Sequence, residues 1–163
     1  MYNIYIVDIL WRSLYMVVDE ISVKRMNILH KRPVDSILPQ FYMNLIPIFL
    51  NQNLPKPSLI LSNWSLEIML KSVYIKEKGS FFPPHTLSFE ILVDLTRCET
   101  GIDIDSVSLI QSVKYLANYP NQTSLQNMSS AHLQKIVRSV DELLCRLSPR
   151  ATDSTVERYS SIF

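Results

Sequence analysis

The sequence predicts an α+β fold, in which one domain holds a small antiparallel sheet packed against about four helices. Apolar residues recur every three or four positions near both ends of the chain, which is typical of amphipathic helices. Two central segments instead alternate apolar and polar residues, which is typical of half-buried strands. The chain has 163 residues, of which 47% are hydrophobic, and a chain of that size can bury a core without disulfides or metal.

Residues 3–21 predict the first helix, because their apolar side chains fall on one helical face. The β-branched start at residues 4–7 leaves a short strand as the alternative. The positions of this face are Val7, Leu10, Trp11, Leu14, Val18 and Ile21.

A second helix is expected to run from Asp35, a suitable N-cap, to Leu45. Pro39 lies in its first turn, where proline is tolerated, and Pro47 should end or kink it. Residues 51–58 contain two further prolines and predict an extended connector.

Two strands are predicted in the middle of the chain, at residues 64–71 and 87–96, with a loop at 76–86 between them. They form a plausible antiparallel pair. Two strands alone make a marginal sheet, so a third is expected from residues 2–7, from residues 58–61 or from a partner chain. An unpaired sheet edge would then be a natural docking site.

Two helices follow the strands. Asp105 is placed to cap the first, and Pro120 stops it. Ser129 or Ser130 can cap the second, and Pro149 should end it. We therefore predict a globular domain over residues 1–148 and a flexible polar tail over residues 149–163. The expected buried stripes are Leu109, Ile110, Val113, Leu116 and Ala117 in the first helix, and Leu133, Ile136, Val137, Val140, Leu144 and Leu147 in the second.

Composition argues for a binding surface over catalysis. The chain has only two glycines, so no glycine-rich phosphate loop and no nucleophile elbow can be written in it. The three histidines lack partners at ligand spacing, and Cys98 and Cys145 lie far apart. We expect no metal, no cofactor and no small-molecule substrate. The charged fraction is 19% and the net charge is +1, which gives no global field for steering toward anionic partners.

The N-terminus has no basic stretch ahead of its apolar run, so we expect no secretory signal. The longest apolar run, residues 37–50, is too short and too interrupted to span a bilayer. The expectation is an intracellular, cytoplasmic protein with no transmembrane segment.

The loop Phe81, Phe82, Pro83 and Pro84 is the first candidate site. Two adjacent phenylalanines in a loop either fold back onto the core or insert into a neighbouring molecule. The second reading makes these four residues an interface anchor.

A local basic cluster is the second candidate. Lys24, Arg25, Lys31 and Arg32 place four positive charges within nine residues. Such a cluster can bind phosphate groups of nucleic acid or of an anionic membrane surface. The alternative is that these are solvated charges of a connector.

Asp103 and Asp105 are the third candidate, because an acidic pair can perform general acid–base catalysis. The structural alternative is that Asp105 caps the following helix while Asp103 favours its N-terminal dipole. We expect no enzymatic activity.

Residues 87–118, LSFEILVDLTRCETGIDIDSVSLIQSVKYLAN, resemble the central strand–turn–helix of rhabdovirus matrix proteins. The likeness lies in an alternating strand, a turn with Arg97, and a helix opened by an Asp and a Val, here Asp105 and Val107. It implies a self-associating virion layer between nucleocapsid and membrane. The chain departs from that family at its start, which is an apolar segment and not a basic arm, and Pro83-Pro84-His85-Thr86 lacks the tyrosine of the family's Pro-Pro-x-Tyr motif.

The sequence therefore predicts a non-catalytic protein–protein assembly subunit, of which a viral matrix-type structural protein is one form. An adaptor that binds nucleic acid or an anionic membrane through residues 24–32 is the alternative. A small enzyme that uses the acidic pair is the third reading.

Overall fold

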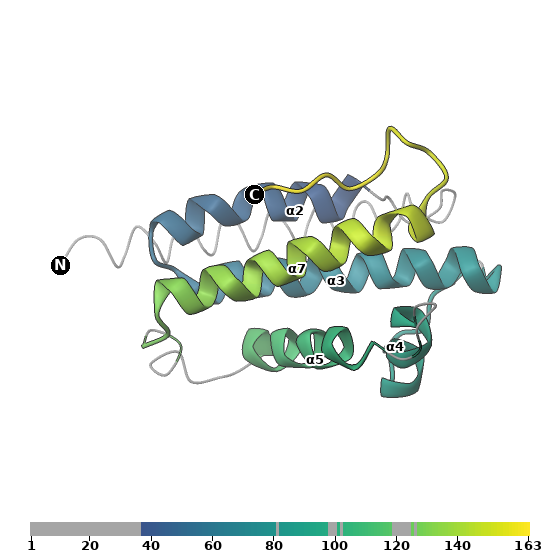
Figure 1. Cartoon of the computed structure of the whole chain (residues 1–163), viewed down its shortest axis with the longest axis horizontal. Coiled ribbons are helices and arrows are strands. Elements are labelled where there is room, and N and C mark those ends of the chain that lie inside the picture. The colour runs from purple at the N-terminus through teal and green to yellow at the C-terminus, as the bar shows by residue number, and fades with distance from the viewer. Residues whose placement is uncertain (1–36, 81, 98–100, 102, 119–124, 126) are drawn as a thin grey trace. The chain divides into compact units, whose positions relative to one another are not determined.

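A computed structural model describes residues 37–163 except 81, 98–100, 102, 119–124 and 126. All of these residues belong to one unit, Val34–Phe163. In this part of the chain the structure is helical and has no sheet, so the predicted α+β class is wrong there. The helices are α2 (Ile37–Asn51), α3 (Pro55–Lys78), α4 (Phe89–Thr96), α5 (Ile104–Asn118) and α7 (Ser130–Ala151), shown in Figure 1.

Helix α3 lies at the centre and contacts the four other helices. Figure 1 shows α2 and α5 on opposite sides of it. Pro55 starts α3 at a position where its missing N–H is not needed. Gly79 ends the helix in the left-handed conformation, with φ of 60°. At the first turn, Lys56 Nζ donates to the carbonyl of Ala117 at 2.7 Å and ties α3 to the end of α5.

The first predicted strand, residues 64–71, lies inside α3. The alternation misled because two positions that it assigns to the polar face, Ser65 and Met69, are buried in α3. Two serines that precede the predicted strand are buried in the same way. Ser58, Ser62 and Ser65 are fully buried, and each hydroxyl donates to the carbonyl four residues earlier, at 2.8–3.0 Å. Ser65 also donates to the carbonyl of Pro39 on α2, at 3.3 Å. A helix buried on several sides has no single apolar stripe for a periodicity search to find.

The second predicted strand, residues 87–96, is helix α4. Ser88 caps it, with its hydroxyl accepting from the Ile91 N–H at 3.4 Å. The buried positions are Leu92, Leu95 and Thr96, whose spacing is helical. Strict alternation requires a polar residue at position 92, but Leu92 is apolar and only 1% exposed.

The turn between α2 and α3 replaces the predicted connector at residues 51–58. Pro47 was expected to end or kink this helix, and it does not end it, because α2 continues to Asn51. Asn53 then takes the left-handed conformation, with φ of 53°. Its N–H bonds to the carbonyl of Leu50 at 3.0 Å, and the Leu54 N–H bonds to that of Phe49 at 2.9 Å. This is a Schellman motif with asparagine in place of glycine.

The two helices predicted after the strands are present as α5 and α7. Ser129 caps α7 by accepting from the His132 N–H at 3.2 Å, as predicted. Pro149 does not end α7, which continues to Ala151. The expected stripes face inward, and the fully buried members are Ile110, Val113, Ala117, Leu133, Val137, Val140, Leu144 and Leu147.

Residues 152–163, which the sequence predicts to be part of a flexible tail, double back from α7 toward α2 in Figure 1. Tyr159 is 6% exposed, and its phenol donates to the buried carboxylate of Asp141 on α7. The Ser160 N–H donates to Gln40 Oε1 on α2 at 2.7 Å. The predicted domain boundary at residue 148 thus falls inside α7.

Candidate interaction surface

Helix α2 exposes large apolar side chains on its outer side. Ile37, Phe41 and Ile48 are 59%, 50% and 52% exposed, and their spacing of four and seven places them on one helical face. We call these three residues the α2 stripe. The opposite face is buried and comprises Pro39, Tyr42, Met43 and Ile46.

The α2 stripe stands on a helix without any charged residue. The 15 residues ILPQFYMNLIPIFLN contain no Asp, Glu, Lys or Arg. Surface helices of soluble proteins ordinarily carry charge on the side that faces water. A face with three large exposed apolar side chains and no charge, interrupted by the exposed amide of Asn44, is a candidate interaction surface.

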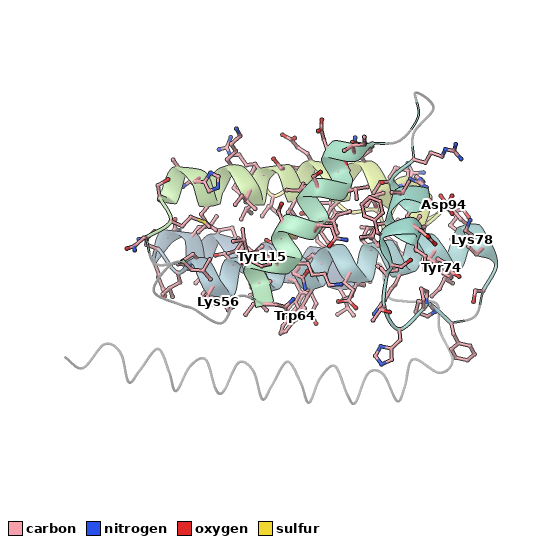
Figure 2. The ribbon with its side chains drawn as sticks, turned by 90° about the horizontal axis from the view of Figure 1, so that it is seen from below. Lys56, Trp64, Tyr74, Lys78, Asp94 and Tyr115 are labelled. Carbon is pink, nitrogen blue, oxygen red and sulfur yellow. The ribbon has the colours of Figure 1, made fainter. Side chains whose placement is uncertain are left out.

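Aromatic contacts hold the centre of the α2 stripe in place. The ring of Phe41 lies 5.8 Å from that of Tyr42, which in turn lies 5.7 Å from the indole of Trp64 on α3. Figure 2 labels Trp64 on α3. Tyr42 is buried, so Phe41 rests on a fixed aromatic neighbour. A rigid aromatic side chain loses little entropy when a partner covers it, which is a property of interface hot spots.

The predicted interface loop lies between α3 and α4. Phe82 is 70% exposed, while Pro83 and Pro84 are partly exposed; Phe81 lies outside the described residues. The hydroxyl of Ser80 donates to the carbonyl of Phe82 at 2.7 Å and accepts its N–H at 3.3 Å. The loop therefore has local structure that presents the Phe82 ring to solvent.

An ion pair closes the base of this loop. Lys78 Nζ at the end of α3 lies 2.6 Å from Asp94 Oδ2 on α4, and Figure 2 shows the two side chains meeting. The hydrogen bond and the charge of Asp94 raise the pKa of Lys78, and the same two effects of Lys78 lower the pKa of Asp94. Both side chains are about half exposed, so the pair orients the loop more than it stabilises the fold.

The acidic pair has structural roles that are the reverse of those predicted. Asp103, not Asp105, caps α5, because Asp103 Oδ1 accepts from the Ser106 N–H at 3.1 Å. Asp103 Oδ2 also lies 2.7 Å from Arg146 on α7. Burial opposes ionisation of Asp103, but the hydrogen bonds from Ser106 and the Arg146 charge outweigh it and lower its pKa. Asp105 is exposed in the first turn of α5.

Lys24, Arg25, Lys31 and Arg32 lie outside the described residues, as does Cys98. Cys145 is a free thiol on α7, and burial raises its pKa, with smaller contributions from Asp141 and Glu142. Among the described residues no three His, Cys, Asp or Glu side chains gather as a metal site would require. No helix in that same part of the chain is long and apolar enough to cross a membrane.

From the sequence, residues 35–45 were predicted only as a short helix, and the α2 stripe was not predicted. The one available signal is the absence of any charge between residues 37 and 51, and it does not tell an exposed apolar face from a buried one.

Comparison with known proteins does not identify the chain. No family model matches it, and no match was found among the curated proteins or the solved structures.

Proposed function

We propose that the protein is a non-catalytic assembly subunit that self-associates through the α2 stripe, with the Phe82 loop as a second contact. The observation that carries the proposal is the outer face of α2, which exposes three large apolar side chains and carries no charge. A viral matrix-type structural protein is one form that such a subunit can take. The segment that carried that resemblance, residues 87–118, is helical at 89–96, where the family pattern has a strand.

A second copy is the partner that an uncharged patch fits best. In a two-fold dimer the same patch lies on both copies, so the apolar side chains of one α2 stripe can pack against those of the other. The α2 stripe carries no charge that this contact would have to remove from water. A charged partner could form no ion pair with the α2 stripe.

The energetics favour several contacts acting together. Covering three half-exposed side chains contributes about 1 kcal/mol each, or about 6 kcal/mol over two copies. Association costs about 4–15 kcal/mol in lost freedom, so the α2 stripe alone supports only weak pairing. Phe82, on a different part of the surface, supplies the additional apolar contact that a stable assembly needs.

Matched serine substitutions test the proposal. Ile48→Ser removes apolar surface from the α2 stripe, and Ile104→Ser removes the same side chain from the exposed face of α5, where Ile104 is 67% exposed. We expect Ile48→Ser to weaken self-association about tenfold or more and Ile104→Ser to leave it unchanged, as measured by sedimentation velocity. Equal effects of the two variants would contradict the proposal.

Salt separates this function from the adaptor alternative. Hydrophobic self-association should change little between low and high salt, whereas phosphate binding through residues 24–32 should weaken steeply. Binding of nucleic acid or anionic vesicles that is lost at high salt would favour the adaptor.

A further inference from the structure

Residues 159–163, which we call the docked segment, are held on α7 by one buried carboxylate. Asp141 is 2% exposed. It accepts hydrogen bonds from the phenol of Tyr159, from the hydroxyl of Ser161 and from the N–H of Ile162, the last at 3.1 Å. Two of the three donors are side-chain hydroxyls, so the contact depends on hydroxyl groups that face a negative charge.

Ser161 combines this contact with exposure to solvent. The residue is exposed although its hydroxyl donates to Asp141, and the Phe163 N–H donates to Ser161 Oγ at 3.3 Å. Arg158, which is also exposed, stands three positions before it. Among the serines and threonines that the structure describes, Ser161 alone has an arginine at that spacing. Many protein kinases select their substrates by a positive charge at a fixed distance before the acceptor hydroxyl.

The docked segment can leave α7 without the loss of any helix. Residues 152–163 form no helix or strand, and Val156, between α7 and the docked segment, is 92% exposed. When the segment leaves, water hydrates Asp141 in place of the three donors, so the open form leaves no charge buried without partners. The catalytic site of a kinase has to surround the acceptor hydroxyl, so a kinase would act on this open form.

A phosphoryl group on Ser161 is incompatible with the closed form. Phosphorylation removes the proton that the hydroxyl donates and adds a charge of about −1.5 to −2 at neutral pH. That charge would lie beside the buried carboxylate of Asp141, where water screens the repulsion only weakly. The guanidinium of Arg138 lies 5.1 Å from the Phe163 ring and contacts the segment through that ring. The lost donor and the repulsion therefore both favour the open form.

We propose that Ser161 is a phosphorylation site and that its phosphorylation releases the docked segment from α7. In the transfer, the Ser161 oxygen forms a bond to the γ-phosphorus of a nucleoside triphosphate, and the bond from that phosphorus to the bridging oxygen breaks. The hydroxyl proton passes to the catalytic carboxylate of the kinase, and a nucleoside diphosphate leaves. The inference is independent of the proposed self-association, because no residue of the docked segment belongs to the α2 stripe or to the Phe82 loop.

Phosphate transfer to the full chain tests the site. The reagents are magnesium ATP and a purified protein kinase that selects arginine three positions before the acceptor. A peptide of residues 156–163, VERYSSIF, gives the rate without docking. We expect one phosphate on Ser161, located by mass spectrometry, and none at this position in Ser161→Ala. The full chain should react at least about tenfold more slowly than the peptide, because docking keeps the open form rare. No phosphate on Ser161 of the full chain overturns the proposal.

Matched variants on α7 show whether docking limits the reaction. Asp141→Asn turns the bonds to a charged group into weaker neutral ones and lies outside the sequence that the kinase reads, so phosphorylation should become about tenfold faster or more. Glu142→Gln removes the same charge from the next, exposed position and should leave the rate unchanged. Circular dichroism checks that both variants fold, and Tyr159→Phe, with its own peptide as the reference, replaces Asp141→Asn if the latter unfolds. Equal rates in the unmodified chain and the weakened variant would contradict the closed form.

Hydrogen exchange tests the release itself. In the closed form the amides of Tyr159, Ser160 and Ile162 each donate to a side chain of α7 or α2. We expect their exchange to be about tenfold faster or more after phosphorylation. Without a kinase, Ser161→Glu should speed it more than Ser161→Gln, which is similar in size and uncharged. Unchanged exchange in the phosphorylated chain, or slower exchange because Arg138 pairs with the phosphate, would refute the release.

Discussion

Replacing Tyr159 by phenylalanine should destabilise the protein measurably while keeping its shape. Tyr159 is 6% exposed, and a phenylalanine ring keeps nearly all of that burial. The loss is one hydrogen bond to the buried Asp141 carboxylate. Bonds to charged groups contribute about 1.5–3 kcal/mol, and Asp141 keeps its other two donors, so we expect about 2 kcal/mol. For a chain of this length the melting temperature should fall by about 4–8 °C.

The pH dependence of this difference has a definite sign. Burial, and then the hydrogen bond and charge of Asp141, raise the pKa of Tyr159 in the folded state. Its neutral form is therefore favoured by folding, and the stabilisation is complete below the unfolded tyrosine value of about 10. Above that pH the unfolded state ionises first and the stabilisation is lost. The stability difference between the native chain and Tyr159→Phe should stay constant to about pH 10 and shrink above it.

Urea unfolding at a series of pH values measures that difference, with Tyr159→Ala as the control. Alanine also removes the buried ring and should cost about 3–5 kcal/mol. A phenylalanine variant as stable as the native chain would show that the hydrogen bond from Tyr159 to Asp141 does not stabilise the fold. A difference that widens above pH 10 would contradict the assigned direction of the pKa shift.

Three further predictions follow from single contacts. Asp103→Ala should lower the free energy of unfolding by about 1 kcal/mol, because a helix cap is lost. Since folding lowers the pKa of Asp103, this stability difference should be present above about pH 4 and disappear as the pH falls through the pKa of the folded state. Acid titration of the two proteins measures it. Gly79→Ala should cost about 1 kcal/mol in thermal or urea unfolding; the cost comes from its φ of 60°, because an added Cβ meets nothing within 4 Å. Asn53→Gly, at a similar φ, should be neutral or stabilising. Phe82→Ala should weaken oligomers in light scattering without lowering the melting temperature, and a large loss of stability would show instead that the ring belongs to the core.

The sequence predicted α5 and α7 well because each buries one stripe. Val137, Val140 and Leu144 recur at helical spacing and are fully buried, and polar residues separate them. Ser129 marked the start of α7, because its exposed hydroxyl accepts from the His132 N–H, which has no partner within the helix. Amphipathic helices at the edge of a core are the case in which periodicity works.

Helices α3 and α4 were predicted as strands for two different reasons. In α3 the buried serines satisfy their own hydroxyls within the helix, so they pack inside while reading as polar. In α4 the segment is short, and Leu92 and Thr96, at positions that alternation assigns to the polar face, are buried together with Leu95. In both segments burial in the tertiary structure determines the helix, and the pattern of a single sequence does not show which residues are buried.

The Phe82 loop was chosen from its composition, and Phe82 is 70% exposed; its role as an interface stays a prediction. The α2 stripe could not be separated from core residues in sequence, because apolar side chains surround the helix. The contact of residues 159–163 with α7 could not be predicted, since no local pattern pairs Asp141 with Tyr159, 18 positions away.

Sedimentation velocity of the unmodified chain over a concentration series, from about 1 to 100 µM, tests the assembly function most directly. A subunit that associates through an apolar, uncharged face should show a sedimentation coefficient that rises with concentration, equally at low and high salt. Ile48→Ser should flatten that rise, and Ile104→Ser should not. A chain that sediments as a monomer throughout the range would contradict the account.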